Sequence, residues 1–260
     1  MEDEENYINE YEAVVLKYNK IAMNYLRLNN LKESLILLRK AEEILNSSES
    51  LVIPNRLKLM SITLNNLGCY YKKRKQPKVA LNYLEKALEL ESDIENDNAN
   101  IASSHLNICA VYSSLNNHKK ALVHAKKAIE MLEEAFTSES SNYDKMLTLS
   151  TSMVISYYNA AVEHEYLYNY SEALKNYNKA LDLSREQLGY DHPMTGNIEG
   201  TLRKFESKNR TRQSRSNFRS VKATINDVEN RLRLPSVAPR TRSLFTVTKT
   251  PAYNATFYNS

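Results

Sequence analysis

The sequence predicts an all-α protein, and three observations indicate this fold class. Only 4 glycines and 6 prolines occur in 260 residues, which leaves few breaks between long helices. Hydrophobic residues make up 42% of the chain, enough to form a core. Phrases with apolar residues at helical spacing recur along the chain, as in "PKVALNYLEKALEL" and "YSEALKNYNKALDL". Together they favour an array of helix pairs.

Four related phrases mark the second helix of each pair. Each phrase holds a small residue that is followed seven positions later by alanine, so both side chains fall on one face of a helix. The four pairs are Ser34 and Ala41, Ala80 and Ala87, Ala121 and Ala128, and Ala173 and Ala180. A partner helix precedes each phrase, most clearly at "LNNLGCYY".

This pattern resembles the tetratricopeptide repeat. In that family one small residue on each of two antiparallel helices lets the helices approach closely, and a large aromatic side chain fills the adjoining gap. The first small position is matched by Ala22, Gly68, Cys109 and Ala161, and the aromatic position by Tyr25, Tyr71 and Tyr112. The fourth repeat departs from the pattern, because His164 stands at its aromatic position.

The resemblance implies a right-handed α-solenoid of about four helix pairs plus a capping helix, with an extended basic C-terminal tail. The small residues of successive repeats are 46, 41 and 52 positions apart, against about 34 in the standard unit. Such long repeats are similar to those of kinesin light chain. We place the array at 1–206, with repeats at roughly 8–47, 58–93, 99–136 and 146–188 and a capping helix at 193–206.

The phrase "LGYDHP" at residues 188–193 carries side chains that also occur in active sites. Each has a role in the backbone: Gly189 tolerates a left-handed conformation, Asp191 can cap a new helix, and Pro193 suits a first helical turn. Long repeats of the kinesin light chain type end in a similar phrase. We therefore predict a turn between repeats rather than a catalytic or metal site.

Asparagine recurs two residues before the small position of the first helix, as Asn66, Asn107 and Asn159, with Lys20 in the first repeat. The resemblance implies that this position faces a groove and holds the backbone of an extended peptide. A carboxamide has both a donor and an acceptor, so it can pair with a peptide N–H and C=O together. The alternative is that these side chains bond only to neighbouring helices.

Neighbours on the same face would give selectivity. Lys73 lies in the basic run "YKKRKQPK", which favours an acidic ligand. The selectivity candidates are Lys72, Lys73, Ser113, Ser114, Glu165 and Tyr166. The predicted partner-binding residues are Asn66, Lys73, Asn107, Asn159 and Tyr166.

The sequence holds no recognisable catalytic or metal-binding motif. Cys69 and Cys109 have neither disulfide nor zinc spacing, and the five histidines are scattered. The triplet "EHE" at 163–165 cannot converge on one ion, because consecutive helical residues point about 100° apart. We expect a protein that is not an enzyme and binds no cofactor.

The charge is unevenly distributed along the chain. Residues 203–260 hold 13 Lys and Arg against 3 Asp and Glu, whereas the whole chain has a net charge of +4. We predict a basic tail at 207–260 that begins with a linker and contains a short amphipathic helix at 220–234, with apolar residues at 221, 225, 228 and 232. The tail arginines expected to anchor a partner are Arg210, Arg212, Arg215, Arg219, Arg240 and Arg242.

These features predict a non-enzymatic scaffold or adaptor whose groove binds a segment of a partner protein. The tail would attach it to an acidic protein surface such as that of tubulin, within a ciliary axoneme or another microtubule assembly. The alternative is an RNA-associated repeat protein that uses the tail. The acidic start of the sequence and the lack of an apolar run of about 18 residues predict a cytoplasmic chain with no membrane span.

Overall fold

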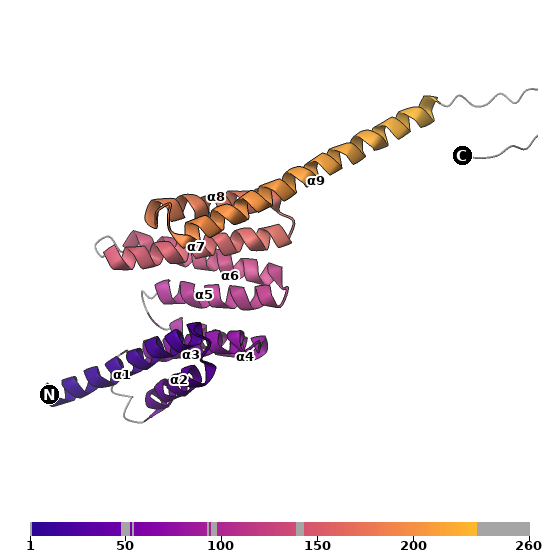
Figure 1. The fold of residues 1–260 in the computed structure, drawn as a ribbon. Coiled ribbons are helices and arrows are strands. Elements are labelled where there is room, and N and C mark those ends of the chain that lie inside the picture. Colours follow the sequence, from indigo (N-terminus) through magenta and orange to yellow (C-terminus); the bar gives the residue numbers. More distant parts are fainter. Residues whose placement is uncertain are drawn as a thin grey trace, which may run out of the picture. The chain divides into compact units, whose positions relative to one another are not determined.

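A computed structural model describes residues 2–47, 53, 55–92, 94, 98–138 and 143–232. The described residues form helix pairs that follow one another along the chain (Figure 1). The pairs are α1 (Glu2–Arg27) with α2 (Leu31–Asn46), α3 (Arg56–Lys73) with α4 (Pro77–Glu91), α5 (Asn98–Ser114) with α6 (His118–Ser138), and α7 (Tyr143–Tyr166) with α8 (Tyr170–Gln187). The last helix, α9, spans Pro193–Leu232.

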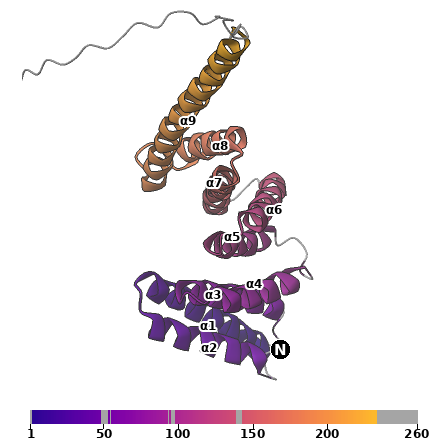
Figure 2. The same ribbon diagram turned by 90° about the vertical axis from the view of Figure 1, so that its right-hand side faces the viewer.

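Within residues 1–210, which form one compact unit, each helix from α1 to α7 packs against the next in chain order. The first helices of neighbouring pairs also touch, because α1 contacts α3, α3 contacts α5, and α5 contacts α7. The stacking of successive pairs is visible in Figure 2. The chain is thus an all-helical solenoid, and α1, α3, α5 and α7 together form one of its faces. We call this the first-helix face.

The same turn joins the two helices of every pair. In each repeat a backbone N–H donates to the carbonyl five residues earlier, at the aromatic position, over 2.9 Å. The residue directly before the donor has a left-handed backbone, as in the common C-terminal cap of helices. These residues are Asn29, Lys75, Asn116 and Tyr168, with φ of 65°, 57°, 58° and 63°. The fourth repeat keeps this turn although its aromatic position holds His164, which is buried.

Small side chains bring the paired helices together. The eight small residues that the four phrases share, from Ser34 to Ala180, have no exposed surface. At Gly68 on α3, an added Cβ would lie 2.5 Å from two carbon atoms of Leu84 on α4 and 3.3 Å from the carbonyl oxygen of Ala80. Real Cβ atoms essentially never approach carbon so closely, so any larger residue here would require the Leu84 side chain or the helix backbones to shift. The sequence prediction of close pairing through small residues is confirmed.

The connection from α8 to α9 is the turn predicted at "LGYDHP". Gly189 has the left-handed φ of 95°, and Pro193 is the first residue of α9. The prediction that Asp191 caps α9 was wrong. His192 does so instead, because its Nδ1 accepts a hydrogen bond from the backbone N–H of Met194 over 3.2 Å. The imidazole precedes Pro193 directly, which is the position from which a side chain reaches the second N–H of a helix.

The helix α9 also departs from the prediction. A cap ending at residue 206, a linker and a separate helix at 220–234 were expected, but α9 runs without a break to Leu232. No glycine or proline occurs between residues 201 and 232, so nothing in the backbone ends the helix. The chain divides into compact units at 210 and 211, within α9.

The first part of α9 packs on the last repeat. Ile198, Leu202 and Phe205 are buried in one cluster with Tyr177 and Leu181 of α8. They cover the apolar surface of α8, which no further repeat would otherwise bury. In the part of the chain that the structure describes, no helix is both long enough and apolar enough to cross a bilayer.

Candidate functional site

The predicted asparagines lie on the first-helix face. Asn66, Asn107 and Asn159 are half-buried and stand on α3, α5 and α7, which are neighbouring first helices. Their side chains differ in what they bond. Two of them make hydrogen bonds to the preceding first helix, and the third makes none within the described residues.

Asn66 is held by α1. Its Nδ2 donates to Oδ1 of Asn19 over 2.7 Å. Asn19 is itself buried and donates to the hydroxyl of Thr63 over 2.9 Å and to the carbonyl of Val15 over 3.0 Å. One of the two N–H groups of the Asn66 carboxamide is therefore used inside the protein, and its Oδ1 and second N–H have no partner among the described residues.

Asn107 is held in the same way by α3. Its Nδ2 donates to Oδ1 of Asn65 over 2.8 Å, and Asn65 donates to the hydroxyl of Ser104 over 2.9 Å. Ser104 in turn donates to the buried carboxylate of Glu91 over 2.9 Å. This chain of hydrogen bonds joins α3, α4 and α5, so Asn107 is a structural residue as well as a candidate ligand residue.

Asn159 lacks such a partner because of one residue on α5. In both bonded pairs the acceptor stands three residues before the small position of its first helix. The donor belongs to the next repeat and stands two residues before the small position there. The corresponding acceptor position for Asn159 holds Leu106, which cannot accept a hydrogen bond. The whole carboxamide of Asn159 is thus available to a ligand.

Lys73 has a structural role at the end of α1. Its ammonium donates to the carbonyl of Leu26 and, over 3.5 Å, to that of Arg27. These carbonyls belong to the last turn of α1, where a cation also interacts favourably with the helix dipole. Lys73 remains exposed, but its charge is partly satisfied within the protein.

Tyr166 belongs to a cluster that the sequence analysis did not predict. Its ring is exposed on one side and stacks on His118 of α6, with ring centroids 4.0 Å apart. Nδ1 of His118 lies 2.7 Å from Oε2 of Glu163, a buried carboxylate on α7. The sequence held one indication of this contact, the carboxylate of Glu163 in "EHE". Its histidine partner is His118 from another repeat and not His164 of the same triplet.

A second histidine contact lies between α5 and α6. The Nδ1 atoms of His105 and His124 are 3.0 Å apart, so one imidazole donates and the other accepts. Burial, with a smaller contribution from the positive charges that His124 and Lys127 can carry, lowers the pKa of His105 to about 4. Burial also lowers the pKa of His124. Both imidazoles are therefore neutral at neutral pH.

The two cysteines are not suited to nucleophilic chemistry. Burial raises the pKa of the Cys109 thiol to about 12, with a further contribution from the Glu163 carboxylate. Burial also raises the pKa of Cys69, although Lys72 opposes the shift. A thiol must ionise to attack a substrate, so neither is activated. Among the described residues, no group of three His, Cys, Asp or Glu side chains lies close enough to hold a metal ion.

A cavity of about 520 Å³ lies between α7 and α9. Its apolar walls come from Val154, Ile155 and Tyr158 of α7 and from Met194 and Ile198 of α9. All lining residues belong to these two helices, and α8 contributes none. The sequence analysis did not predict this cavity, because it depends on how α9 packs beside α7.

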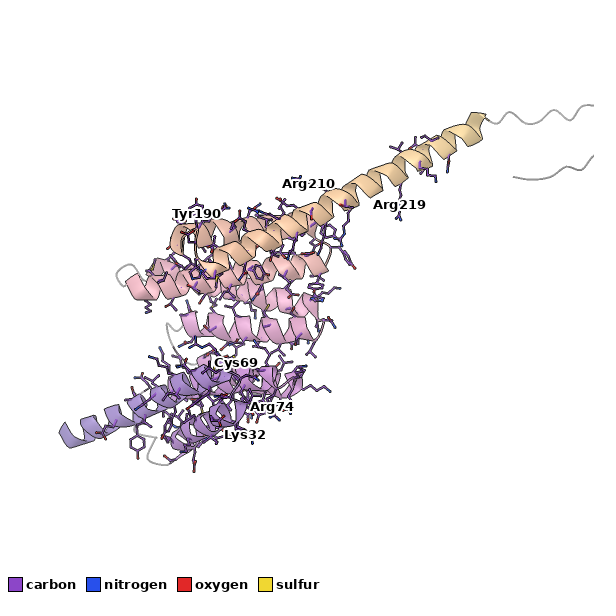
Figure 3. All side chains as sticks on the ribbon, viewed as in Figure 1. Lys32, Cys69, Arg74, Tyr190, Arg210 and Arg219 are labelled. Carbon is purple, nitrogen blue, oxygen red and sulfur yellow. The ribbon has the colours of Figure 1, made fainter. Side chains whose placement is uncertain are left out.

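The predicted tail arginines lie only partly within the described side chains. Arg210, Arg212 and Arg219 are exposed on α9, and Figure 3 labels Arg210 and Arg219. The side chain of Arg215 and all of Arg240 and Arg242 lie outside the described residues. Anchoring through these residues stays a prediction.

Comparison with known proteins supports the repeat. Two tetratricopeptide repeat family models match the chain, one at residues 59–134 and one at 155–193. Both matches include predicted small and asparagine positions. A comparison with curated protein sequences found no match.

Several solved structures have a similar fold. RapI in its apo form has a TM-score of 0.57 and 18% identity, over 76% of this chain and 49% of RapI, so this chain spans about half of that protein. A Rap protein complexed with Competence and Sporulation Factor has a TM-score of 0.58 and 18% identity, over 81% of this chain and 55% of the other. A putative kinesin light chain of Podosopora anserina with nearly identical TPR-like repeats has a TM-score of 0.56 and 15% identity. The similarity covers 81% of this chain and 96% of the other.

Proposed function

Because the chain is a tetratricopeptide repeat protein, we propose that it is a non-enzymatic scaffold that holds an extended segment of a partner protein on its first-helix face. Asn159 is the observation that carries the proposal. Its carboxamide is half-buried on this face, between repeats, and no described protein group satisfies it. A peptide backbone supplies the N–H and C=O that it lacks.

Asn66 and Asn107 would add to the grip through their Oδ1 atoms. Each has its Nδ2 bonded to the preceding first helix, which fixes the carboxamide in one orientation. An acceptor held in place loses little side-chain entropy when a peptide N–H donates to it. The three asparagines are thus not equivalent: the carboxamide of Asn159 has no bond within the described residues, and the other two are each held in one orientation by a bond to the preceding repeat. A solenoid of similar fold, the Rap protein, holds Competence and Sporulation Factor.

The test of this proposal compares two single substitutions. Asn159→Ala should weaken capture of the partner from cells that express the chain, by about tenfold in apparent affinity if two hydrogen bonds are lost. Asn176→Ala is the matched control, because Asn176 lies on α8 and, among the described residues, its side chain bonds only to the Glu172 carbonyl of its own helix. Quantitative pull-down followed by mass spectrometry measures both. Equal capture by Asn159→Ala and by the wild type would contradict the proposal.

The basic segment would supply a second attachment. Exposed arginines at 210 and 219 on α9, together with the net charge of +10 over residues 203–260, favour an acidic protein surface. A microtubule-based assembly such as an axoneme, with tubulin as that surface, is the specific form of this hypothesis. Replacing Arg210, Arg212 and Arg219 by Gln should then reduce co-sedimentation with microtubules at low salt without changing capture by the first-helix face.

A further inference from the structure

The cavity between α7 and α9 is open because α9 carries two glycines on this side. Gly196 and Gly200 are one helical turn apart, and both line the cavity. A Cβ added at either position would have no heavy atom within 4 Å. No side chain of the described residues fills the space above the backbone of α9 here.

The cavity faces the same side as the available asparagine. It is lined by α7 and α9 alone, and Gly196 and Asn197 of its lining are exposed to solvent. Asn159 follows the lining residue Tyr158 and lies one helical turn beyond Ile155, another lining residue. Asn159 therefore lies within one helical turn of the α7 wall of the cavity, close enough for one bound segment to reach both.

One uncompensated cation stands at the rim. Lys204 lines the cavity and is exposed. Its basic neighbours on α9 have carboxylate partners: Arg203 lies 2.8 Å from Glu199, and Lys208 lies 3.8 Å from Glu165. Lys204 has no such partner among the described residues. A carboxylate arriving with a ligand would supply it.

We propose that this cavity binds one large apolar side chain, Leu or Phe, of the partner segment, and that Lys204 binds an Asp or Glu beside it. The inference rests on the proposed function, since it names the residue class that the first-helix face selects. The apolar walls supply affinity by burying the anchor side chain, as central pockets of protein interfaces do. The lysine supplies selectivity for an acidic neighbour.

The chain's own C-terminal segment is a poorer occupant. Residues 233–260 contain apolar side chains, but they hold four Lys and Arg and neither Asp nor Glu. Their charges would repel Lys204 rather than pair with it. An acidic segment from another protein satisfies both features of the site.

The test uses the full-length chain and fluorescein-labelled peptides in polarisation measurements at low salt. The probe GSDDLDDSG should bind about tenfold more tightly than GSDDSDDSG, which lacks the apolar anchor, and than GSKKLKKSG, which reverses the charge. Lys204→Glu should reverse the preference for Asp over Lys. Lys175→Glu, an exposed change on α8, is the matched control and should leave it unchanged.

Gly200→Leu tests the cavity itself. A Cβ at this position meets no heavy atom within 4 Å, and leucine is a better helix former than glycine, so the melting temperature should not fall. The preference for the Leu probe over the Ser probe should disappear. Equal binding of these two probes to the wild type, a preference untouched by Gly200→Leu, tightest binding of the basic probe, or binding of none would each overturn the inference. Loss of partner capture in Asn159→Ala but not in Gly200→Leu would reject the pocket alone and leave the proposed function standing.

Discussion

Neighbouring first helices are joined in two different ways. Between α1 and α3, and between α3 and α5, a buried asparagine accepts a hydrogen bond from a half-buried one, Asn19 from Asn66 and Asn65 from Asn107. Between α5 and α7 the acceptor position is occupied by Leu106, and no asparagine pair forms. A polar contact to α7 comes instead from α6, where His118 lies 2.7 Å from Glu163.

The difference shows that one residue type at one repeat position has two roles. Where the preceding repeat supplies an acceptor, asparagine stabilises the stack. Where it supplies leucine, the asparagine has no hydrogen bond within the described residues, and in our proposal it binds the ligand most fully. The bonding of each asparagine is thus decided by a residue 42 to 53 positions earlier in the chain, and the proposed ligand site is concentrated at the C-terminal end of the array.

The largest expected effect comes from breaking a paired junction. Asn65→Ala removes a buried carboxamide that bonds Ser104 and Asn107, and should lower the free energy of unfolding by about 2 kcal/mol. Asn159→Ala should lower it by less than about 0.5 kcal/mol, because no protein bond is lost. Urea denaturation monitored by circular dichroism measures both. Similar losses for the two variants would mean that the junctions do not differ.

Acid provides the next effect, on the part of the array that contains the histidines. The pKa of His105 is about 4 in the folded protein and about 6.5 when unfolded, so the unfolded chain binds more protons in between. Stability from this group is present above pH 6.5 and is lost as the pH falls towards 4, by about 2 kcal/mol between pH 7 and 5.

Denaturation midpoints at a series of pH values measure this loss. His105→Gln should flatten the dependence between pH 7 and 5, since glutamine does not titrate. A wild-type midpoint that stays constant over this range would contradict the assignment of a buried neutral pair to His105 and His124.

The sequence contained most of the fold but only part of the site. The small residues at seven-residue spacing predicted which helices pair and where they touch, because close packing tolerates little else at positions such as Gly68 and Ala80. The asparagine positions were also visible. Their partners were not visible. Each partner stands three places before the small position of the preceding repeat, and it comes within bonding distance only when the repeats are stacked.

Two further misses have local causes. Residues 207–219 were expected to form a linker because they are polar, but they are helical. Apolar content determines what a helix packs against, not whether its backbone forms a helix. Asp191 was expected as the cap because of its residue type, whereas the distance from Pro193 favoured His192. The cavity could not be inferred from the sequence. Glycines at 196 and 200 indicate only weak helix formation there, and the space beside them becomes evident only once α7 and α9 are placed side by side.

The central claim is that Asn159 binds a partner because Leu106 leaves it free, and converting this junction into a paired one tests it most directly. The measurement is the partner's affinity for Leu106→Asn, with Leu106→Ala as the control that removes the same apolar side chain without adding a carboxamide. The carboxamide introduced by Leu106→Asn would accept the Nδ2 hydrogen of Asn159, so the account predicts an affinity reduced by about tenfold in this variant and little changed in Leu106→Ala. Equal affinities for the two variants would contradict it.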